Sequence, residues 1–280
     1  MEPNPARRLW AALEPVHAVV YFAPEPAAAA KAVGLRGWWM GYFAGRAAPL
    51  GPIGPEPVTS MFYGFAPRMV ARALPDAWTF AAPGDVLRTR IEAVEEALTR
   101  LLGPVELDEL VSLLEQAVAG CRFDGRPLAA AWAAAARPDR PLARLWLATA
   151  ALREHRGDGH VLAAVASGLS GLEASLTHIA TGATTRELVQ PARGWTDDEW
   201  ETATERLVAR GLLDGGALTP AGADVRRTIE EMTDQLAADP LEALGPVAVD
   251  RVVELVTPLS RQVVDSGGLP IPNPMGATRP

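Results

Sequence analysis

The chain has 280 residues, of which 49% are hydrophobic, and its formal net charge is −8 with a pI near 5.1. A chain of this length can bury one large core or two modest ones, and we expect two halves. The acidic balance argues against a general affinity for nucleic acid or anionic membranes, because no basic excess is present to displace counterions. Cys121 is the only cysteine, which excludes an internal disulfide and every multi-cysteine metal site.

Neither a signal peptide nor a membrane span is visible in the sequence. The opening residues lack a basic stretch followed by an apolar one, and no apolar run approaches the roughly 20 residues needed to cross a bilayer. Together with the single cysteine, this pattern leads us to expect a cytoplasmic protein with no membrane partner.

The first half is expected to be a series of helices that prolines bend or end. Two apolar stripes recur at helical spacing, one formed by Leu9, Leu13, Val16 and Val20 and the other by Leu87, Ile91, Val94, Leu98 and Leu101. Pro15 should interrupt the first helix, and Pro24 and Pro26 should end it. The segment Pro49–Pro57 is rich in proline and glycine and is predicted to form a stiff connecting loop.

The second half begins after an irregular stretch, Arg122–Asp139, where we place the domain boundary. The predicted domains are residues 1–122, which are helical and rich in aromatic side chains, and residues 139–265, a long helix followed by a winged helix. The long helix should run from about His160 to Ala180, because one apolar stripe is formed by Leu162, Val165, Leu169, Leu172, Leu176 and Ile179. Residues 266–280 have no periodic pattern and are expected to be a flexible tail, either disordered or draped over the surface.

The segment Arg206–Gly222 has the pattern of the second half of a winged helix. A helix should end at Gly211, a hairpin should turn at the Asp-Gly-Gly that follows, and the next helix should begin with Thr219 as its cap and Pro220 in its first turn. The preceding segment Thr196–Arg210, which would lie in the DNA major groove, carries five carboxylates against two arginines. Such a helix would repel phosphate, so we do not expect nucleic acid as a partner.

Large aromatic side chains concentrate in the first 80 residues, which hold 12 of the 17 in the chain. Such side chains form the walls of pockets for flat or conjugated ligands. Within this region Gly37, Gly41 and Gly45 recur every four residues, so a groove free of side chains should run along one face of a helix. Either the backbone of another helix packs in this groove, or a ligand contacts it.

Two further sets of residues in the first half suggest ligand contacts. Trp38, Tyr42 and Arg46 share the next face of the glycine-striped helix. Arg46 could stack on Tyr42, hold a ligand carboxylate or phosphate, or form a surface ion pair. His17 lies one turn before Tyr21, so both point from one helix toward the same region.

The segment Leu152–His160, LREHRGDGH, is the second candidate site. A helix should end here, the Gly-Asp-Gly should reverse the chain, and His160 should open the long helix. In a structural interpretation, Asp158 caps that helix while the acidic and basic side chains pair. In the functional interpretation, Arg153, Asp158 and His160 form the polar end of a ligand pocket, and His155 or His160 is an acid or base if the protein is an enzyme.

The four histidines, His17, His155, His160 and His178, do not form the pattern of a metal site. No pair has the i, i+4 spacing, and on one helix His160 and His178 would lie about 27 Å apart at 1.5 Å per residue. The P-loop, GxGxxG, GxSxG and HExxH motifs are also absent. We therefore predict no metal site, and the sequence indicates no particular cofactor.

Several of these segments resemble known families. The Leu-Thr-Pro-Ala-Gly of residues 218–222 resembles the start of the long helix after the wing in MarR-type transcription regulators, and this resemblance covers about residues 160–240. Over nearly its whole length the chain is similar to a family of actinobacterial proteins of about 280 residues, described as helix-turn-helix or MarR-like, through Glu14–Glu25, Gly34–Pro52, LREHRGDGH and the LTPAG segment. By analogy, the resemblance implies dimerisation helices and a small-molecule pocket between them and the winged helix.

The expected fold is therefore a mainly α-helical bundle with a MarR-like winged helix, including a small β-wing, in the second half. Arg-Leu-Trp recurs at residues 8–10 and 144–146, each about one turn into a helix. The two halves are either distant copies of one another, or this recurrence is a coincidence of alanine- and leucine-rich helices.

The leading hypothesis is a small-molecule-binding protein for an aromatic or anionic metabolite, built on a winged-helix scaffold that has been put to another use. The expected ligand contacts are His17, Tyr21, Trp38, Tyr42, Arg46, Tyr63, Arg153, Asp158 and His160. Two alternatives stay open: a ligand-responsive MarR-like transcription regulator, and an enzyme that acts on a small metabolite through His155 or His160. The expected partners are the ligand and, in a MarR-like arrangement, a second copy of the chain.

Overall fold

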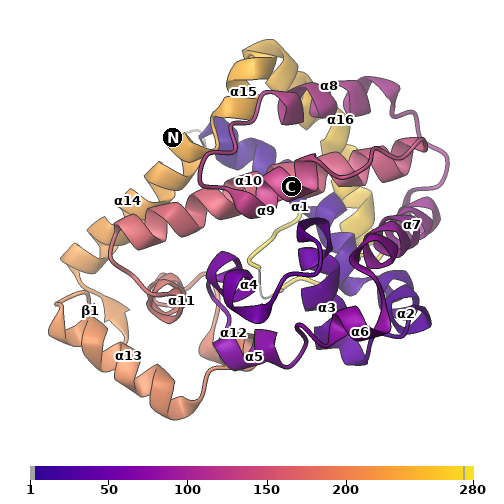
Figure 1. Cartoon of the computed structure of the whole chain (residues 1–280). Coiled ribbons are helices and arrows are strands. Elements are labelled where there is room, and N and C mark those ends of the chain that lie inside the picture. The colour runs from indigo at the N-terminus through magenta and orange to yellow at the C-terminus, as the bar shows by residue number, and fades with distance from the viewer. Residues whose placement is uncertain (1–3, 274) are drawn as a thin grey trace.

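The computed structural model describes residues 4–273 and 275–280, and this part of the chain is mainly α-helical with one small antiparallel sheet (Figure 1). The elements up to residue 133 are α1 (Pro5–Phe22), α2 (Pro24–Ala32), α3 (Gly37–Ala47), the 3-10 helix η1 (Ala48–Leu50), α4 (Pro55–Phe62), α5 (Pro67–Ala71), α6 (Ala77–Phe80), α7 (Pro83–Leu102), α8 (Asp108–Ala119) and α9 (Pro127–Ala133). The remaining elements are α10 (Pro141–Ala166), α11 (Gly171–Ile179), α12 (Arg186–Arg193), α13 (Asp197–Ala209), β1 (Leu213–Asp214), β2 (Ala217–Leu218), α14 (Pro220–Leu236), α15 (Asp239–Leu244) and α16 (Pro246–Asp265).

Proline begins more helices than it breaks. Ten of the described α-helices carry a proline in their first turn, where its missing N–H has no partner to lose; they are α1, α2, α4, α5, α7, α9, α10, α14, α15 and α16. The predicted interruption at Pro15 is wrong, because α1 continues through it. An internal proline costs a helix about 3 kcal/mol. The burial of Val16 and Val19, together roughly 3–6 kcal/mol, offsets that cost.

Helix α10 also corrects the predicted turn at the Gly-Asp-Gly segment. It runs without a break from Pro141 to Ala166, so the chain does not reverse there and His160 lies inside the helix. The glycines weaken the helix, but they allow a close approach: a Cβ atom at Gly159 would lie 3.2 Å from the Cβ atom of Leu236 on α14. Packing against α14, which lies along α10 in Figure 1, therefore overrides the local preference for a turn.

The predicted long helix His160–Ala180 is instead two helices. Gly168 has a positive φ of 69°, and Ser170 caps α11 through a reciprocal capping box with Glu173. The apolar stripe from Leu162 to Ile179 is thus divided between α10 and α11, and the chain changes direction between these two helices (Figure 1). The stretch Arg122–Asp139, expected to be irregular, contains the helix α9.

The small sheet and its flanking helices agree with the sequence-based prediction. Strands β1 and β2 pair in antiparallel fashion, with Leu213 opposite Leu218, and both glycines of the turn have positive φ. Thr219 caps α14, and its hydroxyl accepts a hydrogen bond from Gly222 N at 3.0 Å. Gly222 is required because a Cβ atom there would lie 2.0 Å from the carbonyl oxygen of Leu212.

The buried apolar side chains form two clusters. One contains residues between 9 and 152 together with residues between 252 and 277, and the other contains residues between 163 and 229. Helix α10 passes from the first cluster into the second. Leu269 and Ala277 are buried in the first cluster, so the described part of the tail is draped over the core. The division of the chain at residues 122–139 stays a prediction. Within the described residues, no helix is both long and apolar enough to span a membrane.

Candidate functional site

A cavity of about 240 Å³ lies between α1, α2, α3 and α7. Tyr21, Trp38 and Tyr42, three of the predicted ligand contacts, line it. Trp38 is 48% exposed and stacks on Tyr42 at a centroid distance of 5.3 Å, so the two rings form one aromatic side of the opening. The remaining apolar wall comes from Val20, Ala23, Pro26, Ala27, Ala30, Val33, Leu35 and Val86.

The glycine stripe of α3 faces this cavity and explains its shape. Gly37, Gly41 and Gly45 all line it. A Cβ atom at Gly41 would lie 3.1 Å from the Cβ atom of Ala30, so α2 packs closely against α3 at this level. A Cβ atom at Gly45 would lie 2.5 Å from Nη1 of Arg90, so this glycine makes room for a guanidinium group. The groove therefore serves both helix packing and a charged side chain at the cavity wall.

Arg90 is the polar feature of the cavity. Arg90 is only 9% exposed, its Nε is buried without a hydrogen-bond partner, and no carboxylate among the described residues pairs with its guanidinium. The rings of Tyr21 and Trp146 lie 5.7 and 6.0 Å from its central carbon. Burial lowers the pKa of Arg90 from its usual value, yet arginine stays charged at neutral pH. Lys31, an exposed lysine, lines the same cavity.

Behind the cavity lies a second group of buried charges. The Arg46 guanidinium donates from Nε and Nη2 to the two oxygens of Glu154, each at 2.7 Å, and Nη1 of Arg153 donates to Oε1 at 3.1 Å. Burial acts to raise the pKa of Glu154, but the two guanidinium groups lower it to about 2. Arg46, a predicted ligand contact, is thus occupied by an internal ion pair, and it also packs over the ring of Phe62 at 4.2 Å.

We call this region the polar centre and define it by the charged residues Glu14, Arg46, Arg90, Arg153, Glu154 and Arg193. Glu14 lies 3.8 Å from Arg153, and burial raises its pKa. Arg193 reaches the centre from α12, with its guanidinium 4.3 Å from the ring centroid of Phe65. Four guanidinium groups thus face two carboxylates. The polar centre carries an excess of positive charge beside an apolar cavity.

His17 lies beside the charged residues of the polar centre and is itself neutral. Its ring stacks on Trp146 at 5.8 Å, its Nε2 lies 3.3 Å from the Tyr21 hydroxyl, and its Nδ1 has no partner in the described part of the chain. Burial, reinforced by Arg153, lowers the pKa of His17 well below its usual value. His17 and His155 also line a second cavity of about 30 Å³.

The other residues of the LREHRGDGH segment do not line the main cavity. Asp158 accepts a hydrogen bond from Ala129 N at 3.0 Å, so it caps α9, and burial raises its pKa to about 6. His155 is bonded to Arg126 and faces Asp239 at 3.4 Å. Burial lowers its pKa to about 4. From this segment only Arg153 and Glu154 belong to the polar centre. Tyr63 also lies elsewhere, with its hydroxyl donating to the carbonyl oxygen of Leu169.

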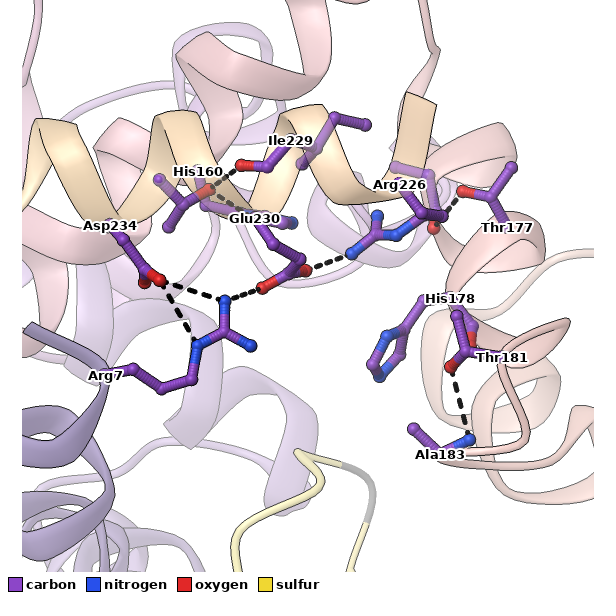
Figure 2. Close-up of polar contacts among 12 residues, drawn as sticks. Arg7, His160, Thr177, His178, Thr181, Ala183, Arg226, Ile229, Glu230 and Asp234 are labelled. Atoms are coloured by element: carbon purple, nitrogen blue, oxygen red, sulfur yellow. Dashed lines mark hydrogen bonds and ion pairs between the residues drawn. The ribbon is translucent and has the colours of Figure 1, made fainter. Parts of the chain in front are cut away.

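His160 and His178 are brought together by the break between α10 and α11. Figure 2 shows both beside α14, with His178 below Arg226. Nδ1 of His160 lies 3.0 Å from the Thr233 hydroxyl, and burial lowers the pKa of His160 to about 4. The estimate of 27 Å between the two histidines is therefore wrong, because it assumed one straight helix. No group of three side chains able to hold a metal ion occurs among the described residues.

Sequence reasoning missed Arg90, Lys31, Glu14 and Arg193, whereas Glu154 lies in the LREHRGDGH segment, whose acidic and basic side chains were expected to pair. One sequence signal could have revealed Arg90. Val86, Arg90 and Val94 follow one another at four-residue spacing, so an arginine interrupts a buried apolar row of α7. The partners of the other charged residues come from helices far apart in the chain, which local spacing does not reveal.

A model of a helix-turn-helix family matches residues 6–270. The chain belongs to this helix-turn-helix family. No curated protein and no solved structure matches it. In this helix-turn-helix protein one face of α13 is acidic, because Asp198, Glu201 and Glu205 are exposed on it.

Proposed function

We propose that this helix-turn-helix protein binds a small organic anion with a flat apolar body, and that the ligand occupies the cavity between α1, α2, α3 and α7. The observation that carries the proposal is the buried guanidinium of Arg90, which has no partner among the described residues and lies at the wall of that cavity. A buried charge without a partner is costly, and a ligand carboxylate, sulfonate or phosphate would supply the partner.

The size and chemistry of the cavity limit the ligand further. Typical ligand pockets have volumes of about 300–1,000 Å³, so a cavity of about 240 Å³ suits a body of one or two rings. Tyr21, Trp38 and Tyr42 offer aromatic faces for such a body. The anionic group would then lie toward Arg90 and the apolar rings toward α2 and α3, with Lys31 near the opening.

The match to a helix-turn-helix family and the hairpin before α14, whose sequence resembles the wing of MarR-type proteins, favour a second candidate function as a ligand-responsive regulator. Two features weigh against direct DNA reading by α13. Its exposed face is acidic, and the arginines Arg206 and Arg210 lie near Glu173 at 3.3 and 3.9 Å. We therefore expect DNA affinity no better than the ~10⁻⁴–10⁻⁶ M of nonspecific binders at physiological salt. Nanomolar, sequence-dependent binding in an anisotropy titration with its own upstream region would favour the regulator.

The proposed function is tested with a matched pair of probes, 2-naphthoate and its neutral amide, 2-naphthamide. The two have nearly the same shape, but only the acid carries the negative charge that can form an ion pair with Arg90. A charge-assisted hydrogen bond is worth about 1.5–3 kcal/mol, which corresponds to roughly 10–100-fold in affinity. Isothermal titration calorimetry should therefore show the acid binding at least tenfold more tightly than the amide. In a separate titration, tryptophan fluorescence should be quenched, because Trp38 lines the cavity.

Arg90→Met removes the charge, while the unbranched methionine side chain replaces the apolar stem of arginine. We expect this variant to lose the preference for the acid while its unfolding free energy stays the same or rises by about 1 kcal/mol, since an unpaired buried charge is removed. Arg88→Met is the control, because Arg88 lies on the same helix and pairs with Asp85 and Glu92 in water. Equal affinity of the wild type for acid and amide, or an unchanged preference in Arg90→Met, would refute the proposal.

A further inference from the structure

The turn between α12 and α13 is docked on residues 63–69, which connect α4 to α5 and form the start of α5. Ala66 N donates to the carbonyl oxygen of Arg193 at 2.9 Å, and Trp195 Nε1 donates to that of Gly64 at 3.0 Å. Arg68 donates to both carboxylate oxygens of Glu199, at 2.8 and 2.7 Å. Backbone, aromatic and charged groups thus join the helix-turn-helix segment to the first half of the chain.

Two glycines bring the second half of the chain close to residues 63–69: Gly194 in the docked turn and Gly171 at the start of α11. A Cβ atom at Gly194 would lie 2.1 Å from Cγ of Met69, and one at Gly171 would lie 1.8 Å from the carbonyl oxygen of Tyr63. Any side chain at either position would force the Met69 side chain or the Tyr63 backbone to move. In DNA-binding helix-turn-helix proteins the N-terminal end of the recognition helix contacts the bases. Here that end of α13 faces the segment 63–69 instead.

The docked turn also completes the polar centre. Arg193 is the last residue of α12, and its guanidinium lies over Phe65. The Phe65 ring is in turn 5.5 Å from the ring of Tyr42, which lines the cavity. Burial lowers the pKa of Arg193, and no carboxylate among the described residues pairs with it. A half-buried cation from the helix-turn-helix segment therefore lies one aromatic ring away from the cavity.

This arrangement gives docking an electrostatic cost. When α12 docks, Arg193 joins Arg46 and Arg153 in a region that has only two carboxylates. Like charges in a buried region repel strongly, because neither water nor salt screens them well. An anion bound beside Arg90 adds the negative charge that the region lacks, and so reduces the cost of bringing Arg193 in.

We infer that the α12–α13 segment forms one side of the polar centre, and that an organic anion in the cavity stabilises its docking on residues 63–69 through Arg193. This inference rests on the proposed function, because it takes the anion in the cavity as given. Binding free energies are reciprocal, so a docked α12–α13 segment must raise the affinity for the anion by the same factor by which the anion favours docking.

The first test follows amide hydrogen exchange in the wild-type protein with and without saturating 2-naphthoate. Ala66 and Gly194 donate backbone hydrogen bonds within or beside the docked turn, so their exchange reports on it. We expect the anion to slow exchange in residues 64–69 and 193–199 at least threefold more than in the hairpin at residues 213–218. Equal exchange in these segments with and without bound anion would overturn the inference.

The second test is the reciprocal one and uses Arg68→Ala. Arg68 is exposed and lies outside the cavity, so its loss should weaken docking without altering the ligand contacts. We expect faster exchange in residues 193–199 and at least threefold weaker binding of 2-naphthoate, while Arg88→Ala changes neither. If the Arg68→Ala protein exchanged faster in residues 193–199 but bound 2-naphthoate with wild-type affinity, this inference would be overturned and the proposed function would stand. Absence of 2-naphthoate binding to the wild type would overturn the proposed function as well.

Discussion

Helix α10 has two groups of buried polar residues that differ in how their charges are balanced. On one side Glu154 faces the polar centre, where guanidinium groups outnumber carboxylates and Arg90 lacks a partner among the described residues. On the other side His155, Asp158 and His160 face α9 and α14. Both groups are buried and both have shifted pKa values, so neither burial nor a shifted pKa identifies the site.

The distinction lies in the partners. Arg156 pairs with Asp234 at 2.6 Å, and Asp239 lies near both Arg126 and His155, at 3.7 and 3.4 Å. These contacts hold α10 against α14 and α15 and leave little for a ligand to complete. Around the cavity, by contrast, the protein alone does not supply enough negative charge. An unpaired buried charge beside a cavity is therefore the more informative sign of a ligand site.

The largest effect that tests this comparison is expected from Glu154→Gln. Glutamine keeps the shape of the side chain but leaves the charges of Arg46 and Arg153 uncompensated, and breaking a buried ion pair in this way costs about 3–5 kcal/mol. Urea denaturation should show a loss of that size. Glu109→Gln should change stability far less, because the Glu109–Arg251 pair lies at the surface. A small loss for Glu154→Gln would show that the polar centre does not need its carboxylates.

The sequence predicted best those elements that are determined by local chemistry. The hairpin between β1 and β2 and the start of α14 follow from two glycines with positive φ, a threonine cap and a proline in the first turn. The turn at residues 157–159 was predicted on the same kind of evidence and is wrong. Two glycines in a helix cost about 2 kcal/mol, less than the packing of α14 along α10 returns, and that packing involves residues more than 70 positions apart.

The candidate site was predictable only in part. The aromatic and glycine pattern of α3 indicated a groove, and Tyr21, Trp38 and Tyr42 line the cavity that the structure contains. Arg46 and Arg153 point to the same region but are paired with Glu154. Arg90 and Arg193 come from helices that approach α3 only in the folded chain, so their roles follow from tertiary packing.

A change of intermediate size is expected from His160→Asn, which tests the balanced side of α10. Burial lowers the pKa of His160 to about 4 from the usual 6.5, so the folded state resists protonation and the wild type should lose stability as the pH falls from 6.5 toward 4. Asparagine does not titrate and can keep the hydrogen bond to Thr233.

The variant should therefore lose about 2 kcal/mol less than the wild type between pH 7 and pH 4.5, as measured by denaturation at each pH. Between pH 7 and pH 8 neither protein should change, which serves as the control. Parallel losses in the two proteins at low pH would show that His160 is not held neutral by the fold. A change in 2-naphthoate affinity at pH 7 would instead connect this side of α10 to the cavity.

The smallest effect, about tenfold in affinity or 1.4 kcal/mol, is expected from Gly45→Ala, which acts on the unbalanced side through geometry alone. The new methyl group would lie 2.5 Å from Nη1 and 3.2 Å from Cδ of Arg90, so the guanidinium must move. It is the far end of a flexible side chain, and the helix gains from alanine, so stability should change by less than about 1 kcal/mol. The displaced guanidinium should, however, no longer meet the anionic group of 2-naphthoate.

Gly84→Ala provides the matched control, because Gly84 lies near the start of α7 and a Cβ atom there would meet nothing within 4 Å. Calorimetry should show weaker binding of the acid only in Gly45→Ala, and unchanged binding of the neutral amide in both variants. If the acid bound both variants equally, the position of the Arg90 guanidinium would not matter for binding. The unpaired charge would then be a tolerated cost of folding, and the two sides of α10 would no longer differ in function.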